Sequence, residues 1–400
     1  MKTVNEQIFD KLVKHQAYLL RLVSKQSDDF ITALNKNNPK LAAFLLENLS
    51  ELNLADTKTS AIKWRKFEQA LKQVRAEMFT GFKTEYDKDL IKIIDNETKY
   101  MKALYDNSIA LAEISMAVPV IEKTNLLNYG AIDGKTISRY FEEIQYGDID
   151  RIVQNIRTGL IERKPVYQIV NDLIGSKNIE YNDGVTQLTR NNARSLVRTI
   201  TQGIVNSSRE EFYKANSDIV KQERFTAVLD GRTTVQCLSL DGNLYLLGEG
   251  PNPPLHRNCR SLRIAVIDGM ALVGERGYVT DTRTPRQLRI DWRADAKKAV
   301  GADEWKTLTE KERYKLIAKE RTAWQNANIG QTPVKTTGSQ WLKTTDKSFQ
   351  DDFLGKKQAE LFRSGQLTLD KFVDNSGKKL SVDELYGMYA DEFKKAGIKP

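Results

Sequence analysis

The chain has 400 residues, of which 29% are charged and 40% hydrophobic, and its formal net charge is +9 at pH 7. This length is enough for two or three domains with real cores. The longest apolar-leaning run is too short to cross a bilayer, which takes about 20 apolar residues, so no membrane span is expected. The first residues include the acidic Glu6 and no apolar run of the kind found in signal peptides, so the sequence does not predict a signal peptide.

The cysteine content and the net charge indicate the compartment and the partners to expect for this protein. Two cysteines cannot form a disulfide framework for a chain of this size, and they favour a reducing compartment, with a single bridge still open. The positive excess favours a polyanionic partner such as nucleic acid, but a smooth excess also keeps many proteins in solution.

Residues 5 to about 130 predict helices, because the first glycine is Gly81 and apolar residues recur at helical spacing. Pro39 predicts the start of a second helix. His15 falls in the first apolar stripe, which predicts a packed or partly buried histidine rather than a ligand. The three stripes are Ile8, Leu12, Leu19 and Leu22; Leu41, Phe44, Leu45, Leu49 and Leu52; and Phe67, Leu71, Val74 and Met78.

Two more helices follow a boundary predicted near Gly134, the first ending near Pro165 and the second at Gly175. A later helix carries Arg190, Arg194 and Arg198 on one face, spaced i, i+4, i+8. This face predicts a solvated basic stripe. The alternative is that Arg198 makes a charge-assisted contact with Asp230.

The rarest residue types gather in residues 230–261, called here the signature stretch. Three of the four cysteines and histidines of the chain lie in it. Pro251, Pro253 and Pro254 fix φ just before His256, so a stiff loop is predicted to return a histidine and a cysteine toward an earlier cysteine. The distinctive residues, in chain order, are Asp230, Arg232, Thr233, Cys237, Asp241, Gly242, Pro254, His256, Cys259 and Arg260.

Short strands are predicted to carry this stretch. Apolar residues alternate over residues 225–229 and again over residues 262–266, and Asp241-Gly242 is a turn signal before Leu244 and Leu246. The sequence therefore predicts a small, mostly antiparallel sheet with a proline-rich return loop.

Each group of polar residues in the stretch has an expected role. Asp230 can accept N–H groups of the following turn, and Arg232 can fork onto a carboxylate or carbonyls, so both are predicted structural anchors. Cys237, His256 and Cys259 are predicted to converge, where they could hold zinc. Three ligands with one open position would also suit a catalytic zinc, and a Cys-His nucleophile pair is a further alternative.

The signature stretch resembles the phage head morphogenesis family, the minor head proteins similar to the F protein of phage Mu. In that family an Asp-x-Arg-Thr run, a cysteine, a Leu-Asp-Gly turn and a Pro-Leu-His-x-x-Cys-Arg close recur in this order. Many relatives have another cysteine at the position of Thr234, forming C-x-x-C with Cys237. The cluster here therefore offers three possible protein ligands, one fewer than a structural zinc site of four protein ligands needs.

The segment after the signature stretch is basic. Residues 271–345 contain 15 Lys and Arg against 9 Asp and Glu, which gives +6 of the total +9. Trp292, Trp305 and Trp324 are interleaved with these bases. Such a pattern can hold phosphates and stack bases, but tryptophans on helices more often pack in a core.

Residues 341–400 resemble the C-terminal stretch of many phage minor head proteins. Their pattern predicts a helix, a turn at 375–377 and a final helix capped by Ser381, with Glu384 at the capping-box position.

The expected fold is mainly α with a small α+β module: a helical N-terminal region, a short antiparallel sheet carrying the signature loop, and a helical C-terminal region. Four regions are expected: residues 1–133 (helical), 134–270 (head-morphogenesis domain), 271–340 (basic helical linker) and 341–400 (C-terminal minor-head-protein segment).

The resemblance implies a structural minor capsid protein of a tailed bacteriophage that acts in head morphogenesis and is not an enzyme. It also implies that the protein is associated with the portal and is packaged or ejected with the genome. It implies partners among the portal and other head proteins, and a location in the virion, at the head interior or portal vertex, after assembly in the host cytoplasm. Packaged double-stranded DNA, bound without sequence preference, would be a further partner. The alternatives are a metal-dependent hydrolase or nuclease using Cys237, His256 and Cys259, and a host nucleic-acid-binding protein.

Overall fold

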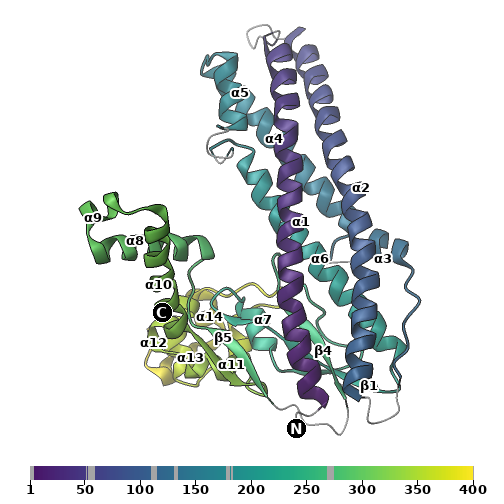
Figure 1. Ribbon diagram of the computed structural model, residues 1–400, viewed down its shortest axis with the longest axis vertical. Helices are drawn as coiled ribbons and strands as arrows, with labels where there is room; N and C mark the ends of the chain where they lie inside the picture. Colours follow the sequence, from purple (N-terminus) through teal and green to yellow (C-terminus); the bar gives the residue numbers. More distant parts are fainter. Residues whose placement is uncertain are drawn as a thin grey trace. The chain divides into compact units, whose positions relative to one another are not determined.

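The computed structural model describes residues 4–50, 52, 59–109, 115–129, 134–176, 181, 183–267 and 274–399. These residues form fourteen α-helices and two three-stranded sheets, so the fold is mainly α with a small α+β module, as the sequence predicts (Figure 1). None of the described helices combines the length and apolar character needed to cross a membrane.

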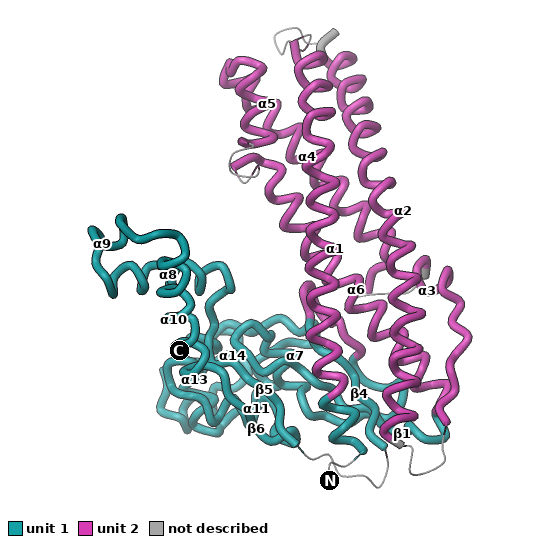
Figure 2. Tube along the Cα trace, viewed as in Figure 1, with its two compact units in different colours: residues 1–10, 217–251, 260–400 teal, residues 11–216, 252–259 magenta. Residues whose placement is uncertain are grey.

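The chain divides into two compact units (Figure 2). A helical unit comprises residues 11–216 with 252–259, and a mixed unit comprises residues 1–10, 217–251 and 260–400. This division follows contacts in space, whereas the four regions predicted above follow chain order. The boundaries predicted after residues 133 and 270 lie outside the described residues, and the one after residue 340 falls inside a helix, α11 (Gly338–Thr344).

Long amphipathic helices build the helical unit. One core collects apolar side chains of α1, α2, α3, α4 and α6, including Phe30, Phe79 and Tyr140. A second core joins Leu41, Leu45 and the later residues of α1 to α2, α4 and α5. The helices are α1 (Val4–Leu49), α2 (Thr59–Ile109), α3 (Lys123–Tyr129), α4 (Ile137–Ile161), α5 (Val166–Ile174) and α6 (Gln187–Ala215).

The helix start predicted at Pro39 is wrong, because Pro39 lies inside α1. A proline in a helix interior costs about 3 kcal/mol through the lost N–H bond and the ring clash. Leu41, Leu45 and Leu49 each have at most 1% of their surface exposed in the second core. Burying an apolar side chain of this size contributes about 2 kcal/mol each, which offsets the proline.

The predicted stripes of the helical unit are buried unevenly. His15 is packed, since its ring stacks on that of Tyr100 at 3.6 Å between centroids and its Nε2 lies 2.7 Å from Glu97. This confirms the packed histidine. Along α6, Arg190 is 3% exposed whereas Arg198 is exposed, so the predicted solvated stripe holds at one end and is wrong at Arg190, whose side chain reaches Asn35.

The mixed unit contains both sheets. In the first, the order is β3-β1-β4 and both pairings are antiparallel. In the second, the order is β2-β5-β6, with β2 parallel to β5 and β5 antiparallel to β6. The strands are β1 (Val220–Thr226), β2 (Leu229–Asp230), β3 (Leu244–Leu246), β4 (Leu262–Ile267), β5 (Glu275–Val279) and β6 (Ile329–Pro333).

The single strand predicted over residues 225–229 is two strands in different sheets. The N–H of Ala227, between β1 and β2, donates to the carboxylate of Asp241 at 2.7 Å. A side chain therefore replaces the ladder bond at this position, and the chain leaves the first sheet for the second.

Short helices fill the rest of the mixed unit. Ser381 and Glu384 form the predicted capping box of α14, and the predicted turn closes with the N–H of Gly377 donating to the carbonyl of Asp374. The helices are α7 (Val235–Leu240), α8 (Pro285–Val300), α9 (Ala302–Thr307), α10 (Glu310–Asn328), α11, α12 (Lys347–Leu354), α13 (Lys356–Arg363), the 3-10 helix η3 (Leu369–Phe372) and α14 (Val382–Ala396).

One core of the mixed unit joins the signature stretch to the C-terminal segment. Leu229, Val235 and Leu238 pack with Trp341, Phe362 and other apolar residues of α11 to α14. At Gly338, a side chain would meet Leu238 within 2.6 Å, so the approach of α11 to α7 requires glycine. The signature stretch and the C-terminal segment thus share one hydrophobic core.

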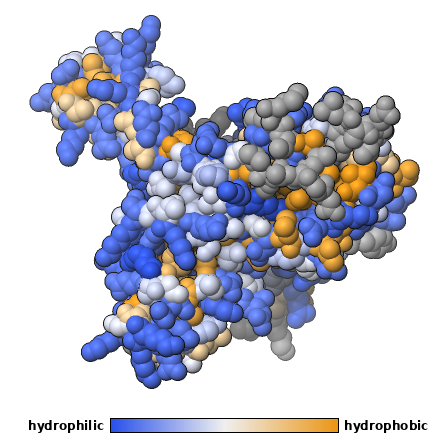
Figure 3. Space-filling view, turned by 90° about the horizontal axis from the view of Figure 1, so that it is seen from below, coloured by the Kyte–Doolittle hydropathy of each residue, from blue (hydrophilic) through white to orange (hydrophobic). Residues whose placement is uncertain are grey.

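The molecular surface agrees with the charged composition. The face in Figure 3 is mostly hydrophilic, with patches of apolar residues between the polar ones. Single exposed apolar residues are normal on a protein surface and assign no site by themselves.

Candidate metal centre

The return loop, residues 252–259, is fixed to α6 by side-chain hydrogen bonds. Asn206 donates to the carbonyl of Pro253 at 2.8 Å. At the other end of the loop, the N–H of Asn258 donates to Thr199 Oγ1 at 3.0 Å, and Asn258 Nδ2 donates to Ser195 Oγ at 3.0 Å. The bond between Pro253 and Pro254 is cis, and Pro254 is buried. This loop carries His256 and Cys259.

Cys237 lies in α7, a helix that the sequence reasoning missed. Thr234 is the N-cap of α7, and its Oγ1 accepts the N–H of Cys237 at 3.3 Å. An N-cap threonine satisfies one of the unpaired N–H groups at a helix start. Thr234 therefore serves as a helix cap.

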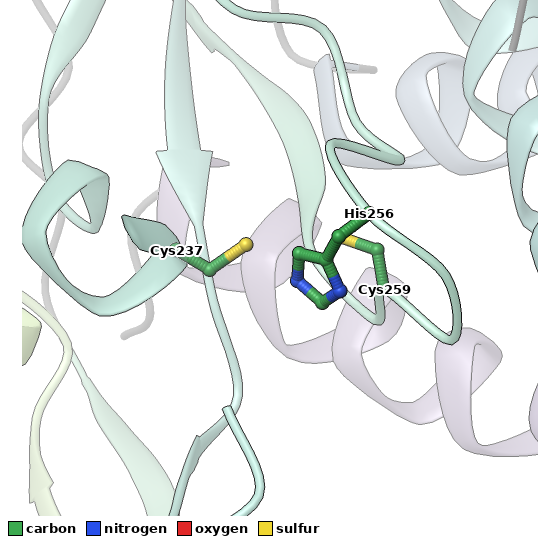
Figure 4. A group of neighbouring side chains, drawn as sticks. All are labelled: Cys237, His256 and Cys259. Atoms are coloured by element: carbon green, nitrogen blue, oxygen red, sulfur yellow. The ribbon is translucent and has the colours of Figure 1, made fainter. Parts of the chain in front are cut away.

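The structure brings Cys237, His256 and Cys259 together, with their possible ligand atoms all within 4.8 Å of one another (Figure 4). Zinc binds cysteine sulfur at about 2.3 Å and histidine nitrogen at about 2.0 Å, so tetrahedral ligand atoms lie roughly 3.5–3.8 Å apart. A small contraction of the cluster would reach that spacing. Two thiolates and an imidazole are ligands that zinc prefers, so these residues fit a zinc ion.

The surroundings of the cluster suit a buried site. Cys237 and Cys259 are 1% and 3% exposed, form no disulfide, and flank a partly exposed His256. His256 Nδ1 lies 2.9 Å from the carbonyl of Arg257. If Nδ1 carries the proton and donates to that carbonyl, Nε2 keeps the lone pair that a metal requires.

Asp230 is held by Arg260 in a two-pronged ion pair. Both guanidinium contacts measure 2.7 Å, and the N–H of Arg232 donates to the same carboxylate at 3.0 Å. Burial raises the pKa of Asp230, but the hydrogen bonds and charge of Arg260 outweigh burial and leave the pKa below its ordinary value. The guanidinium of Arg232 is about half exposed and makes a longer contact with the Asp230 carboxylate, at 3.4 Å. Arg260 also donates to Thr233 Oγ1.

Asp241 has a similar role at the turn. It is 1% exposed and accepts two hydrogen bonds from Arg276, at 2.9 and 3.0 Å, besides the N–H of Ala227. Gly242 has φ +93°, and a side chain there would meet Thr337 Cγ2 at 2.7 Å. Both the backbone conformation and the close approach require glycine after Asp241.

Sequence reasoning missed the residues that complete these contacts. Arg276 contributes to the basic charge of its segment, and no motif marks Arg263, which donates to Glu223 and to the carbonyls of Glu249 and Pro251. Asn206 had one available signal: it follows Gln202 by four positions, so two amides share one face of a helix that is otherwise largely apolar there. Arg276 had none, because its partner Asp241 is 35 positions away.

A scan against protein-family models found no match to this chain. Searches of curated proteins and of solved structures found none either.

Proposed function

We propose that this chain is a structural minor head protein of a tailed bacteriophage, acting in head morphogenesis near the portal. The observation that carries the proposal is the order and rarity of the signature residues from Asp230 to Arg260. Their arrangement supports it, because Asp230 and Asp241 each accept hydrogen bonds from an arginine. The two cysteines and His256 also lie close to one another. The shared core of α7 and the C-terminal segment adds support from the second stretch that resembles the same family.

A structural use of the cluster is favoured over catalysis. The two cysteines are nearly inaccessible, and the Thr234 side chain next to Cys237 caps the backbone of α7. A structural zinc would join α7 to the return loop, supplying cross-linking and no reaction. The same argument makes the chain a non-enzyme in this proposal, with the portal, other head proteins and packaged DNA as its partners.

A hydrolase or nuclease is the second candidate, because three protein ligands leave one position open, as in catalytic zinc sites. Zinc content separates the candidates only together with activity. The protein should be purified under reducing conditions, its zinc measured by mass spectrometry of the metal, and the zinc-loaded protein assayed on ester and nucleic-acid substrates. Turnover that disappears in His256→Ala would support the enzyme and overturn the structural reading.

The assembly role is tested in the virus that encodes this chain. Mass spectrometry of purified particles should find the protein in the head, and deletion of its gene should lower the yield of infectious heads. A deletion strain that produces normal numbers of infectious particles, together with the absence of the protein from wild-type particles, would contradict the proposal.

A further inference from the structure

A cavity of about 350 Å³ lies within the mixed unit, outside the cluster described above. Its walls come from the ends of β2 and β5 and from α8 and α10. Drug-sized ligand sites begin at about 300 Å³, so the cavity could take one small aromatic ligand. Its polar lining includes four arginines and two tryptophans: Arg232, Arg283, Arg289, Arg321, Trp292 and Trp324.

The acidic groups of this cavity are already neutralised. Asp281 accepts hydrogen bonds from Arg283 and, at 2.7 Å, from Trp324 Nε1. Burial raises the pKa of Asp281, but the hydrogen bonds from Arg283 and Trp324 outweigh it and hold the pKa below its ordinary value. Asp230 is held by Arg260 as described above. Neither carboxylate is therefore left to attract a cation.

The hydrogen-bond donors that line the cavity, in contrast, are in excess of the acceptors. Arg289 and Arg321 are exposed and have no ion pair or hydrogen bond within the part of the chain that the structure describes. Trp292 Nε1 is buried, again without a partner among the described residues. Pro285, the first residue of α8, also lines the cavity, so the positive end of a 16-residue helix opens there. These groups together favour an anion.

The two tryptophans add an aromatic wall. Trp292 and Trp324 are partly buried and contact each other at 5.5 Å between ring centroids, inclined by 59°. Trp305, the third tryptophan of this segment, is 7% exposed under Arg313 and does not line the cavity. Aromatic faces beside arginines stack bases of single-stranded nucleic acid, and a base in a duplex cannot enter such a site.

We propose that this cavity binds a nucleotide, with Arg289 and Arg321 on the phosphate and the tryptophan pair against the base. The shared chemistry is a phosphate joined to an aromatic base, supplied either by a free nucleotide or by the end of a single DNA strand. The nucleotide site goes beyond the proposed assembly role, and its test does not depend on that role.

The test uses the full chain and a hexameric oligo-dT with a 5′ phosphate and a 3′ fluorescein, followed by fluorescence anisotropy. Unlabelled dAMP, the same oligonucleotide, a blunt duplex and inorganic phosphate serve as competitors. The double variant Arg289→Gln/Arg321→Gln removes the unpaired charges. Its matched control, Arg293→Gln/Lys319→Gln, removes two exposed charges from the same two helices outside the cavity.

We expect the single strand to bind and the cavity variant to bind at least about tenfold more weakly, since each hydrogen bond to a charged group that is lost lowers affinity by about tenfold or more. The control should lose much less. Competition by dAMP would assign the site to free nucleotides, whereas competition by the oligonucleotide alone would assign it to strand ends. Equal losses in both double variants, equal competition by inorganic phosphate and dAMP, or no binding at low salt would each overturn the proposal.

Discussion

The buried ion pairs of the two units are built differently. In the helical unit, Arg209 contacts Glu97 through Nε alone, at 2.6 Å, and its two terminal nitrogens have no partner among the described residues. In the mixed unit, Arg260 and Arg276 each contact a carboxylate with two nitrogens. Arg263 contacts Glu223 with one nitrogen, but its guanidinium also donates to two backbone carbonyls.

The contrast follows from the backbone. A long helix satisfies its own N–H and C=O groups, so its buried charges are free to join helices to one another. The mixed unit has strands of two to seven residues, and its loops leave backbone groups unpaired. There Asp241 accepts the N–H of Ala227, Asp230 accepts that of Arg232, and Arg263 donates to two carbonyls. The side chains of these ion pairs therefore satisfy backbone groups that regular secondary structure would otherwise pair.

The largest effect is expected from Asp241→Ala. It leaves Arg276 buried without its carboxylate and Ala227 without an acceptor, which should cost about 4–6 kcal/mol of unfolding free energy. Chemical denaturation with hydrogen exchange of peptides from each unit would show the loss in the mixed unit. Asp391→Ala, at an exposed position of α14, is the control and should change stability by less than about 0.5 kcal/mol.

Glu97→Gln should destabilise the helical unit by about 3 kcal/mol, because Arg209 stays buried with its charge uncompensated. Burial raises the pKa of Glu97, but Arg209 and His15 outweigh it, so the pKa lies below the ordinary 4.5. The ionised carboxylate therefore stabilises the fold above that pH, and this contribution is lost as the pH falls through the folded-state pKa.

The pH dependence separates this pair from a neutral packing contact. Unfolding of the wild type should become easier on acidification below about pH 4.5, the ordinary glutamate value. Glu97→Gln should lose part of that dependence in the helical-unit peptides. An unchanged acid profile in the variant would mean that Glu97 does not stabilise the unit through its charge.

Asp230→Ala should lower stability by about 2 kcal/mol, less than Asp241→Ala, because Arg260 is 18% exposed and can turn to water. Thermal unfolding measures this directly, and Asp230→Asn should recover part of the loss by keeping an acceptor for the N–H of Arg232. A variant that melts like the wild type but is missing from virus particles would make Asp230 a partner contact instead of a structural anchor.

The smallest effects concern Thr234. Thr234→Ala removes the cap of α7 and should cost about 1 kcal/mol. Thr234→Cys should cost a similar amount in the presence of a chelator, yet gain more stability than the wild type on adding zinc, since it offers a fourth ligand beside Cys237. Equal zinc responses of Thr234→Cys and wild type in thermal unfolding would remove the link between this position and the cluster.

The sequence by itself determined the features that depend on near neighbours along the chain. Apolar residues at helical spacing placed the stripes of α1 and α2, Gly175 ended α5, and Ser381 with Glu384 capped α14. The signature stretch was found from rare residue types, and its prolines correctly indicated a return loop. Such patterns are local because helix and turn energies act within a few residues.

Only the tertiary structure decided the contacts between distant positions. The helix continues through Pro39 because Leu41 and Leu45 pack on α2, α4 and α5. This packing outweighs the low helix propensity of proline, which acts only locally. Asp241 has Arg276 as its partner, and the cavity of α8 and α10 brings Arg289 to Arg321, 32 positions further on. Spacing cannot encode these pairings, since they follow from how short elements bury their apolar faces and then satisfy the backbone groups left over.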